Sequence, residues 1–185
     1  MASSTINPTE SAYRTLITTF GMLKRVMEPF FAQHGISGGQ WGVLRVLLRA
    51  GEEGQPALRL MDLSDRLLIR PPSVTGVVDG LERLGLVDRV TDESDQRSKQ
   101  ISLTAAGRKL ARQLVRSHAQ RVQVIMSGLS HSEQADLQRL MERVRAQLET
   151  MDVPAAGAGD TNDHGNNGGN GSKRRGTNGR KTEAI

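Results

Sequence analysis

The chain has 185 residues, a formal net charge of +5 and no cysteine. This length allows one ordinary domain with a hydrophobic core, and the lack of cysteine excludes disulfides, thiolate metal sites, cysteine nucleophiles and thiol redox sensing. No apolar run approaches the roughly 18 residues of a membrane helix, so we expect a soluble cytoplasmic protein, and the positive charge favours polyanionic partners.

Residues 9–34 place apolar side chains along one face of a helix. Successive members of this stripe are one, three or four residues apart: Tyr13, Leu16, Ile17, Phe20, Leu23, Met27 and Phe30. The spacing predicts a long amphipathic helix, which Gly35 is expected to end. A second helix, which follows Ser37, is apolar over more than half of its circumference, so we expect it at the centre of the fold.

The segment from residue 57 predicts a short third helix that ends before Pro71 and Pro72. Proline restricts the residue before it and lacks a backbone donor, yet it suits the first turn of a helix, so a new helix is expected to start at once. One face of this fourth helix is a valine and leucine stripe closed by Gly85. The opposite face carries small or hydrogen-bonding residues: Ser73, Thr75, Gly76, Asp79 and Arg83.

Two short β-like stretches, LVDRVT and KQISL, flank the charged loop DESDQRS. Thr104 then precedes a helix, and the pattern from Ser130 to Glu133 is a capping box that predicts a last helix. Beyond residue 152 the chain is rich in Gly and Asn and has too few large apolar residues to bury, so we expect a disordered tail over 152–185 and a flexible N-terminus over 1–8.

Helix, break, helix and hairpin, in this order, form the winged helix-turn-helix arrangement. The second helix of such a pair enters the major groove, while the hairpin loop reaches the adjacent minor groove. We therefore expect a mainly α fold with a small β-hairpin wing that binds double-stranded DNA. The candidate DNA-binding residues are Ser73, Thr75, Gly76 and Arg83 on the helix and Arg97, Ser98 and Lys99 on the wing.

The stretch VTGVVDGLERLGLVDRVTDESDQRSKQISLTAAGRKL resembles the recognition helix, wing and L-T-x-x-G helix start of the MarR-type transcriptional regulators. The resemblance covers about residues 10–150. It implies a homodimer in which the first and last helices (9–34 and 105–151) intertwine, with a DNA-binding lobe over 36–104 and one domain over 9–151. It also implies a pseudopalindromic DNA site, usually repression, and often release by a small aromatic ligand.

The wing departs from the family pattern D-x-x-D-R-R. Here the corresponding residues run from Asp92 to Arg97 with Gln96 in place of one arginine, so Arg97 alone is expected to contact the minor groove. Asp95 is expected to hold the wing, because a carboxylate facing phosphate would be repelled. The alternatives without a binding role are that Arg97 is a solvated loop charge and that Ser73 and Thr75 only cap the helix.

The charge distribution gives a mixed signal. Between residues 57 and 104 seven basic residues face eight acidic ones, so the expected reading head is not basic overall. The next helix, 105–128, has five basic residues and no acid, and its early turns are expected to add phosphate contacts. The alternative function is a helical dimer that binds a small molecule or a protein without specific DNA binding.

A ligand site is expected near the turn between the first two helices. Its candidate residues form an apolar pocket with a polar handle: Met27, Phe30, His34, Trp41 and Met61. The alternative is that the aromatic side chains are plain core. His118 and His131 are interpreted as surface histidines without a metal, and the lack of catalytic motifs predicts a protein that is no enzyme and needs no cofactor.

Overall fold

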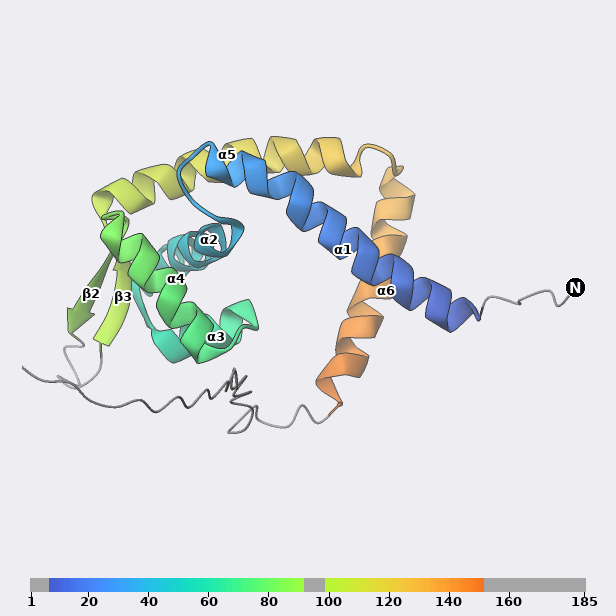
Figure 1. The fold of residues 1–185 in the computed structure, drawn as a ribbon, viewed down its shortest axis with the longest axis horizontal. Helices are drawn as coiled ribbons and strands as arrows, with labels where there is room; N and C mark the ends of the chain where they lie inside the picture. The colour runs from blue at the N-terminus through green and yellow to red at the C-terminus, as the bar shows by residue number, and fades with distance from the viewer. Residues whose placement is uncertain (1–6, 92–98, 152–185) are drawn as a thin grey trace, which may run out of the picture. The chain divides into compact units, whose positions relative to one another are not determined.

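The computed structural model describes residues 7–91 and 99–151, which form a mainly helical chain with a small antiparallel sheet (Figure 1). In chain order the elements are α1 (Pro8–Ala32), α2 (Gly38–Glu52), β1 (Ala57–Arg59), α3 (Leu60–Leu67), α4 (Pro71–Arg83), β2 (Val87–Thr91), β3 (Lys99–Leu103), α5 (Ala105–Met126) and α6 (His131–Glu149). This order confirms the expected fold class. The chain divides into two compact units, the first ending at Ser130 and the second beginning with α6.

Short local signals set the ends of the first two helices. The Asn7 side chain accepts a hydrogen bond from the backbone N–H of Thr9 and caps α1. Ser37 and Gln40 form a reciprocal capping box at the start of α2, in which each side chain accepts from the other residue's backbone N–H. Between the two helices Gly35 adopts a φ of +72°, which costs glycine less than any other residue, so the chain turns there as expected.

Helix α2 is the centre of the first unit, as its apolar circumference predicted. It contacts α1, α3, α4, α5 and the strands β1 and β3, and Figure 1 shows it surrounded by them. The fully buried large side chains come from α2, α3, α4, α5 and the sheet: Leu44, Leu47, Leu63, Leu81, Ile101, Leu114, Val43, Val74, Val78 and Val87. Residues 36–91 and 99–114, which we call the winged lobe, thus share one core, to which α1 adds Met27 and Phe31.

The sheet has three strands in the order β1-β3-β2, all antiparallel. The sequence predicted only the β2–β3 hairpin, and the expectation that the third helix begins at residue 57 was wrong. Residues Ala57–Arg59 instead pair with β3, with Leu58 opposite Ile101. Leu58 is buried while Arg59 is exposed, which is the alternation of a strand, but three residues are too short for that period to be recognised in a sequence.

The L-T-x-x-G motif joins α5 to the end of α4. The Thr104 hydroxyl donates to the carbonyl of Gly85 at 2.8 Å and accepts from the N–H of Gly107 at 2.9 Å. A Cβ on Gly107 would lie 1.9 Å from the carbonyl oxygen of Leu86, so only glycine fits there. The motif therefore fixes the start of α5 against the α4–β2 turn.

The helices outside the lobe have exposed apolar stripes. On α1 the stripe residues Tyr13, Ile17 and Phe20 are all more than half exposed. No residue of α6 is buried, and its apolar stripe is exposed throughout: Leu137, Leu140, Met141, Val144 and Leu148. These stripes have helical spacing, but within residues 7–91 and 99–151 nothing in the unit to which each helix belongs covers them.

Candidate nucleic-acid interface

The turn between α3 and α4 is short and tightly held. Leu68 follows α3 in the left-handed conformation with a φ of 53°, and the hydroxyl of Ser64 donates to the carbonyl of Ile69. Helix α4 then begins at Pro71, with Arg70 as its N-cap and without a side-chain cap hydrogen bond. The proline break and restart expected from the sequence are thus confirmed, and Ser73 does not serve as the cap.

Helix α4 has one buried and one exposed face. Val74, Val78 and Leu81 are fully buried against the lobe, whereas Leu84 follows the helix and is half exposed. On the other face Ser73, Gly76 and Arg83 are exposed, and a Cβ on Gly76 would meet nothing within 4 Å. Within the described part of the chain, this face is therefore open to another molecule.

Thr75 lies between the two faces and is half-buried. Its hydroxyl donates to the carbonyl of Pro71 at 3.1 Å, one turn earlier in α4. This bond uses the hydroxyl proton and fixes the side-chain rotamer. The hydroxyl oxygen of Thr75 can still accept a hydrogen bond, and it does so from a fixed direction.

Gly80, also on α4, is buried rather than open. A Cβ there would lie 2.8 Å from Nε2 of Gln40, so the small residue permits close packing of α4 on α2. The two glycines of this helix thus differ: Gly80 serves the fold, while Gly76 faces outward.

Arg89 on β2 anchors α4 to the sheet. Its Nε donates to Oε2 of Glu82 at 3.0 Å, and its other guanidinium nitrogen pairs with Asp79. The hydrogen bond with Glu82, which outweighs the effect of partial burial, raises the pKa of Arg89. This one cation therefore neutralises part of the negative charge that Asp79 and Glu82 place on α4.

The sequence did not identify Arg89. A signal was present, since Arg89 is two residues from the buried Val87 and hence on the same face of the strand, and Asp79 and Glu82 are three residues apart on one helix face.

The hairpin of β2 and β3 carries the wing. Its last described pair is Thr91 opposite Lys99, and Lys99 is exposed. The predicted wing residues Asp95, Arg97 and Ser98 lie outside the described residues. The strands nevertheless place the two ends of the wing beside each other, next to the sheet edge that α4 contacts.

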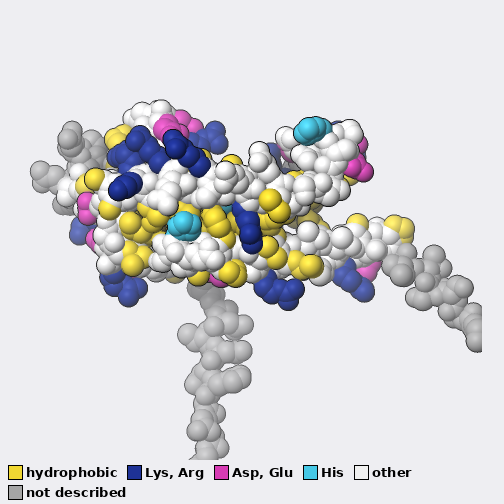
Figure 2. Space-filling model, turned by 90° about the horizontal axis from the view of Figure 1, so that it is seen from above, with side chains coloured by type: hydrophobic (Ala, Val, Ile, Leu, Met, Phe, Trp, Pro, Cys, Tyr) yellow, Lys and Arg dark blue, Asp and Glu magenta, His cyan; other side chains and the backbone are white. Residues whose placement is uncertain are grey.

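An aromatic cluster lies at the junction of α1, α2 and α5. The ring of Trp41 is 6.2 Å from Phe31 and 5.5 Å from His118, and Phe30 is 5.5 Å from His34. Figure 2 shows a histidine surrounded by hydrophobic side chains on one face of the molecule. Of the five predicted ligand residues, the structure thus brings Phe30, His34 and Trp41 together.

Of the other two predicted ligand residues, Met27 belongs to the same buried cluster as Trp41 and Phe31, whereas Met61 does not. Met27 is buried in the hydrophobic core, while Met61 lies on α3 and is 59% exposed, outside the set packed against that core.

His118 is not the surface histidine that the sequence suggested. It is half-buried, and its ring is 6.1 Å from Phe31 and nearly parallel to it. Burial, and secondarily the positive charge of Arg45, lower the pKa of His118 below its usual range. The signal was its spacing, because His118 follows the apolar residues Leu110 and Leu114 at intervals of four and so continues their helix face.

Neither a metal centre nor a membrane helix is found among residues 7–91 and 99–151. No three His, Asp or Glu side chains gather in a way that could hold a metal ion. No helix in this part of the chain is both long and apolar enough to span a bilayer.

Known proteins resemble this chain in sequence and in fold. The model of the MarR family matches residues 34–98. The HTH-type transcriptional regulator FarR of Neisseria gonorrhoeae is 30% identical over 138 residues, which cover 72% of this chain and 91% of FarR.

Two solved structures share the fold. S. aureus MepR, solved in complex with DNA, is 25% identical with a TM-score of 0.65, covering 75% of this chain and 97% of MepR. NadR, solved in complex with 4-hydroxyphenylacetate, is 28% identical with a TM-score of 0.59, covering 82% of this chain and 100% of NadR. With a regulator matched over nearly its whole length and the winged architecture shared with these structures, the chain belongs to the MarR family.

Proposed function

We propose that the protein is a sequence-specific DNA-binding transcriptional regulator, and specifically a repressor of nearby genes. The observation that carries the proposal is the open face of α4, where Ser73 and Gly76 project from a helix whose other face is locked into the lobe. Family membership and the DNA complex of MepR support it. The proposed activity is exerted on the chromosome in the cytoplasm and requires no catalysis.

In the proposed complex α4 lies in the major groove, which is about 12 Å wide and admits one helix. Ser73 and Thr75 offer hydroxyl groups to base edges, and Gly76 lets the helix backbone approach closely. Arg83 contacts the phosphate backbone. Lys99 and Arg97 lie on or near the wing, where a cation in the adjacent minor groove gains from its enhanced negative potential.

We further propose that two copies bind one pseudopalindromic site. The exposed apolar stripes of α1 and α6 support a homodimer, because apolar helix faces of this length are stabilised only when another surface covers them. A second copy would present the same α4 with two-fold symmetry, so the half-sites would be centred about 34–36 Å apart.

The aromatic cluster is the proposed site of a small aromatic effector. Phe30, Trp41 and His118 provide ring surfaces, and Arg45 lies near enough to lower the pKa of His118, so a planar acid would find both apolar contact and a cation. NadR binds 4-hydroxyphenylacetate, which is a ligand of this chemical class. The effector would release DNA only if it binds the arrangement incompatible with DNA more tightly.

Base reading by α4 is tested with Thr75→Val, which removes the hydroxyl and keeps the shape. We expect the protein to fold normally and to bind its selected duplex about tenfold more weakly, because a base-edge contact contributes ~1–3 kcal/mol. Thr15→Val is the matched control, since Thr15 on α1 also donates to the carbonyl one turn earlier, at 2.9 Å. Equal duplex affinities for the two variants would exclude Thr75 from the interface.

The wing is tested with Arg97→Ala and Lys99→Ala in separate variants. Each removes one cation near phosphate, so the slope of log affinity against log salt should become shallower by about 0.9. Duplex affinities measured over a salt series give this slope. An unchanged slope for both variants would indicate that neither side chain contacts the DNA.

A further inference from the structure

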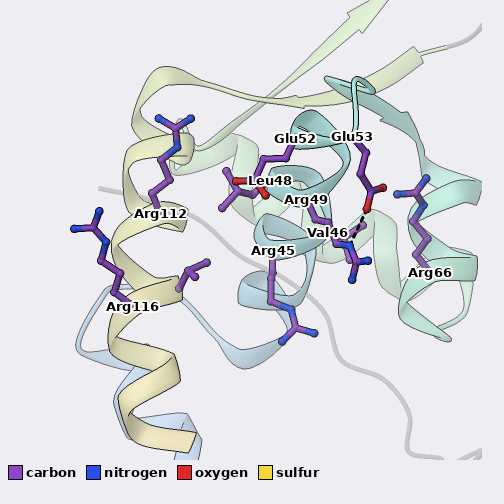
Figure 3. Close-up of a pocket in the computed structure, with 10 residues that line it drawn as sticks. Arg45, Val46, Leu48, Arg49, Glu52, Glu53, Arg66, Arg112 and Arg116 are labelled. Carbon is purple, nitrogen blue, oxygen red and sulfur yellow. Dashed lines mark hydrogen bonds and ion pairs between the residues drawn. The ribbon is translucent and has the colours of Figure 1, made fainter.

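A groove that takes no part in the proposed DNA contacts crosses the exposed side of α2, and of its side chains only Arg45 also belongs to the proposed effector site. It has a volume of about 770 Å³, and Figure 3 shows α2 between Arg112 and Arg116 of α5 on one side and Arg66 of α3 on the other. Val46, Leu48 and Val115 give it an apolar floor. Five arginines line it: Arg45, Arg49, Arg66, Arg112 and Arg116.

The positive charge of this groove is incompletely balanced. Its acidic residues are Glu52 and Glu53, and Glu53 pairs with Arg49 at 2.8 Å. Arg66 donates to the amide oxygen of Gln55, which carries no charge. Among the described residues no carboxylate lies within ion-pair distance of Arg45, Arg112 or Arg116.

Some exposed arginines outside the groove have a partner on their own helix, while others, such as Arg25 and Arg121, have no carboxylate within ion-pair distance among the described residues. Arg14 on α1 and Arg139 and Arg145 on α6 each pair with a carboxylate three or four residues away on the same helix. Helix α5, in contrast, contains no acidic residue, and Arg112 and Arg116 stand four residues apart, as do Arg45 and Arg49 on α2. Like charges at this spacing repel each other, so an anion bound in the groove would reduce the repulsion between these arginines.

The groove is distinct from the aromatic cluster. No residue of α1 and no aromatic side chain lines it, and among its arginines only Arg45 has a described effect on that cluster. Guanidinium groups bind phosphates and carboxylates through paired N–H donors, and several of them together favour a ligand with more than one such group.

We propose that this groove binds a small polyanion, a molecule with two or more phosphate or carboxylate groups, that bridges α5 and α2. The inference does not rest on DNA binding by α4, because it concerns the free protein and a different set of side chains. Bridging α2 to α5 would also stabilise the winged lobe against unfolding, since a ligand that binds only the folded chain shifts that equilibrium.

The test is calorimetric titration of the full chain with citrate and with inorganic tripolyphosphate at constant ionic strength. We expect at least one of them to bind, and the stronger one identifies carboxylate or phosphate as the preferred group. Arg49→Gln with Arg112→Gln should weaken that binding roughly hundredfold, about tenfold for each arginine lost. Both side chains are exposed, so circular dichroism should show an unchanged fold.

The matched control is Arg139→Gln with Arg145→Gln, which removes the same charge from α6 and should leave the binding unchanged. Arg116→Gln alone should weaken binding about tenfold. Failure of both probes to bind, or an equal loss in the control, would overturn the proposal. So would a groove variant that loses duplex affinity while the wild type binds neither probe, because the arginines would then contact the DNA backbone.

Discussion

The winged lobe encloses a hydrophobic core within one chain, whereas α6 has no buried residue. Leu63, Val78 and Leu81 of the lobe are inaccessible to solvent, but the stripe of α6 is exposed along its length. A helix of about 20 residues is only marginally stable in water unless its apolar face packs against something. The comparison teaches that the lobe folds on its own contacts, while α6 depends on a partner, which we propose is a second copy.

The largest effect is expected inside the lobe, from Gly107→Ala. The new Cβ would lie 1.9 Å from the carbonyl oxygen of Leu86, so the start of α5 must move away from the α4–β2 turn. We expect a loss of about 3 kcal/mol or more in the free energy of unfolding, measured by chemical denaturation. Gly128→Ala is the control, because nothing lies within 4 Å of its Cβ position.

On α6 the corresponding change acts on association rather than folding. Leu140→Glu places a charge on the exposed apolar stripe, so a dimer that buries this stripe should dissociate roughly a hundredfold more readily. Analytical ultracentrifugation measures the dissociation constant. Gln138→Glu adds the same charge at a polar position and should leave it nearly unchanged, and equal effects of the two changes would remove α6 from the interface.

A smaller effect separates stability from function on α4. Gly76→Ala should raise the free energy of unfolding by about 1 kcal/mol, because alanine favours a helix and nothing lies within 4 Å of its Cβ. The same change should weaken duplex binding about tenfold, since the added methyl group would occupy space that the bound DNA needs. Gly21→Ala on α1, also with open space around it, should not reduce duplex affinity.

The smallest effect concerns pH and the aromatic cluster. Burial lowers the pKa of His118 below the usual 6.5, so the unfolded chain binds a proton more readily than the folded one. This contribution to stability is fully present above pH 6.5 and is lost as the pH falls through the folded pKa. His118→Phe should flatten the pH dependence of the unfolding free energy below pH 6.5, and an unchanged profile would contradict the burial of this ring.

Much of the fold could be predicted because local rules decide it. The proline pair starts α4, Gly85 closes α4, and Thr104 caps α5, each through a constraint that operates within a few residues. Strand β1 was not predicted, because its pairing with β3 joins residues more than 40 positions apart and no local sequence pattern encodes such a contact.

The candidate site was predicted less completely, for the same reason. The open face of α4 follows from helical periodicity, but Arg89 and His118 owe their roles to contacts with other elements. The arginine groove is likewise assembled from α2, α3 and α5, so its charge becomes visible only when the three helices are packed.

The most direct test of the central claim is hydroxyl-radical footprinting on a duplex selected by the full chain from a random pool. Binding by two copies through α4 predicts two protected segments, related by two-fold symmetry and centred about one helical turn apart. A single protected segment without a symmetric partner, or selection that enriches no sequence at all, would contradict the account.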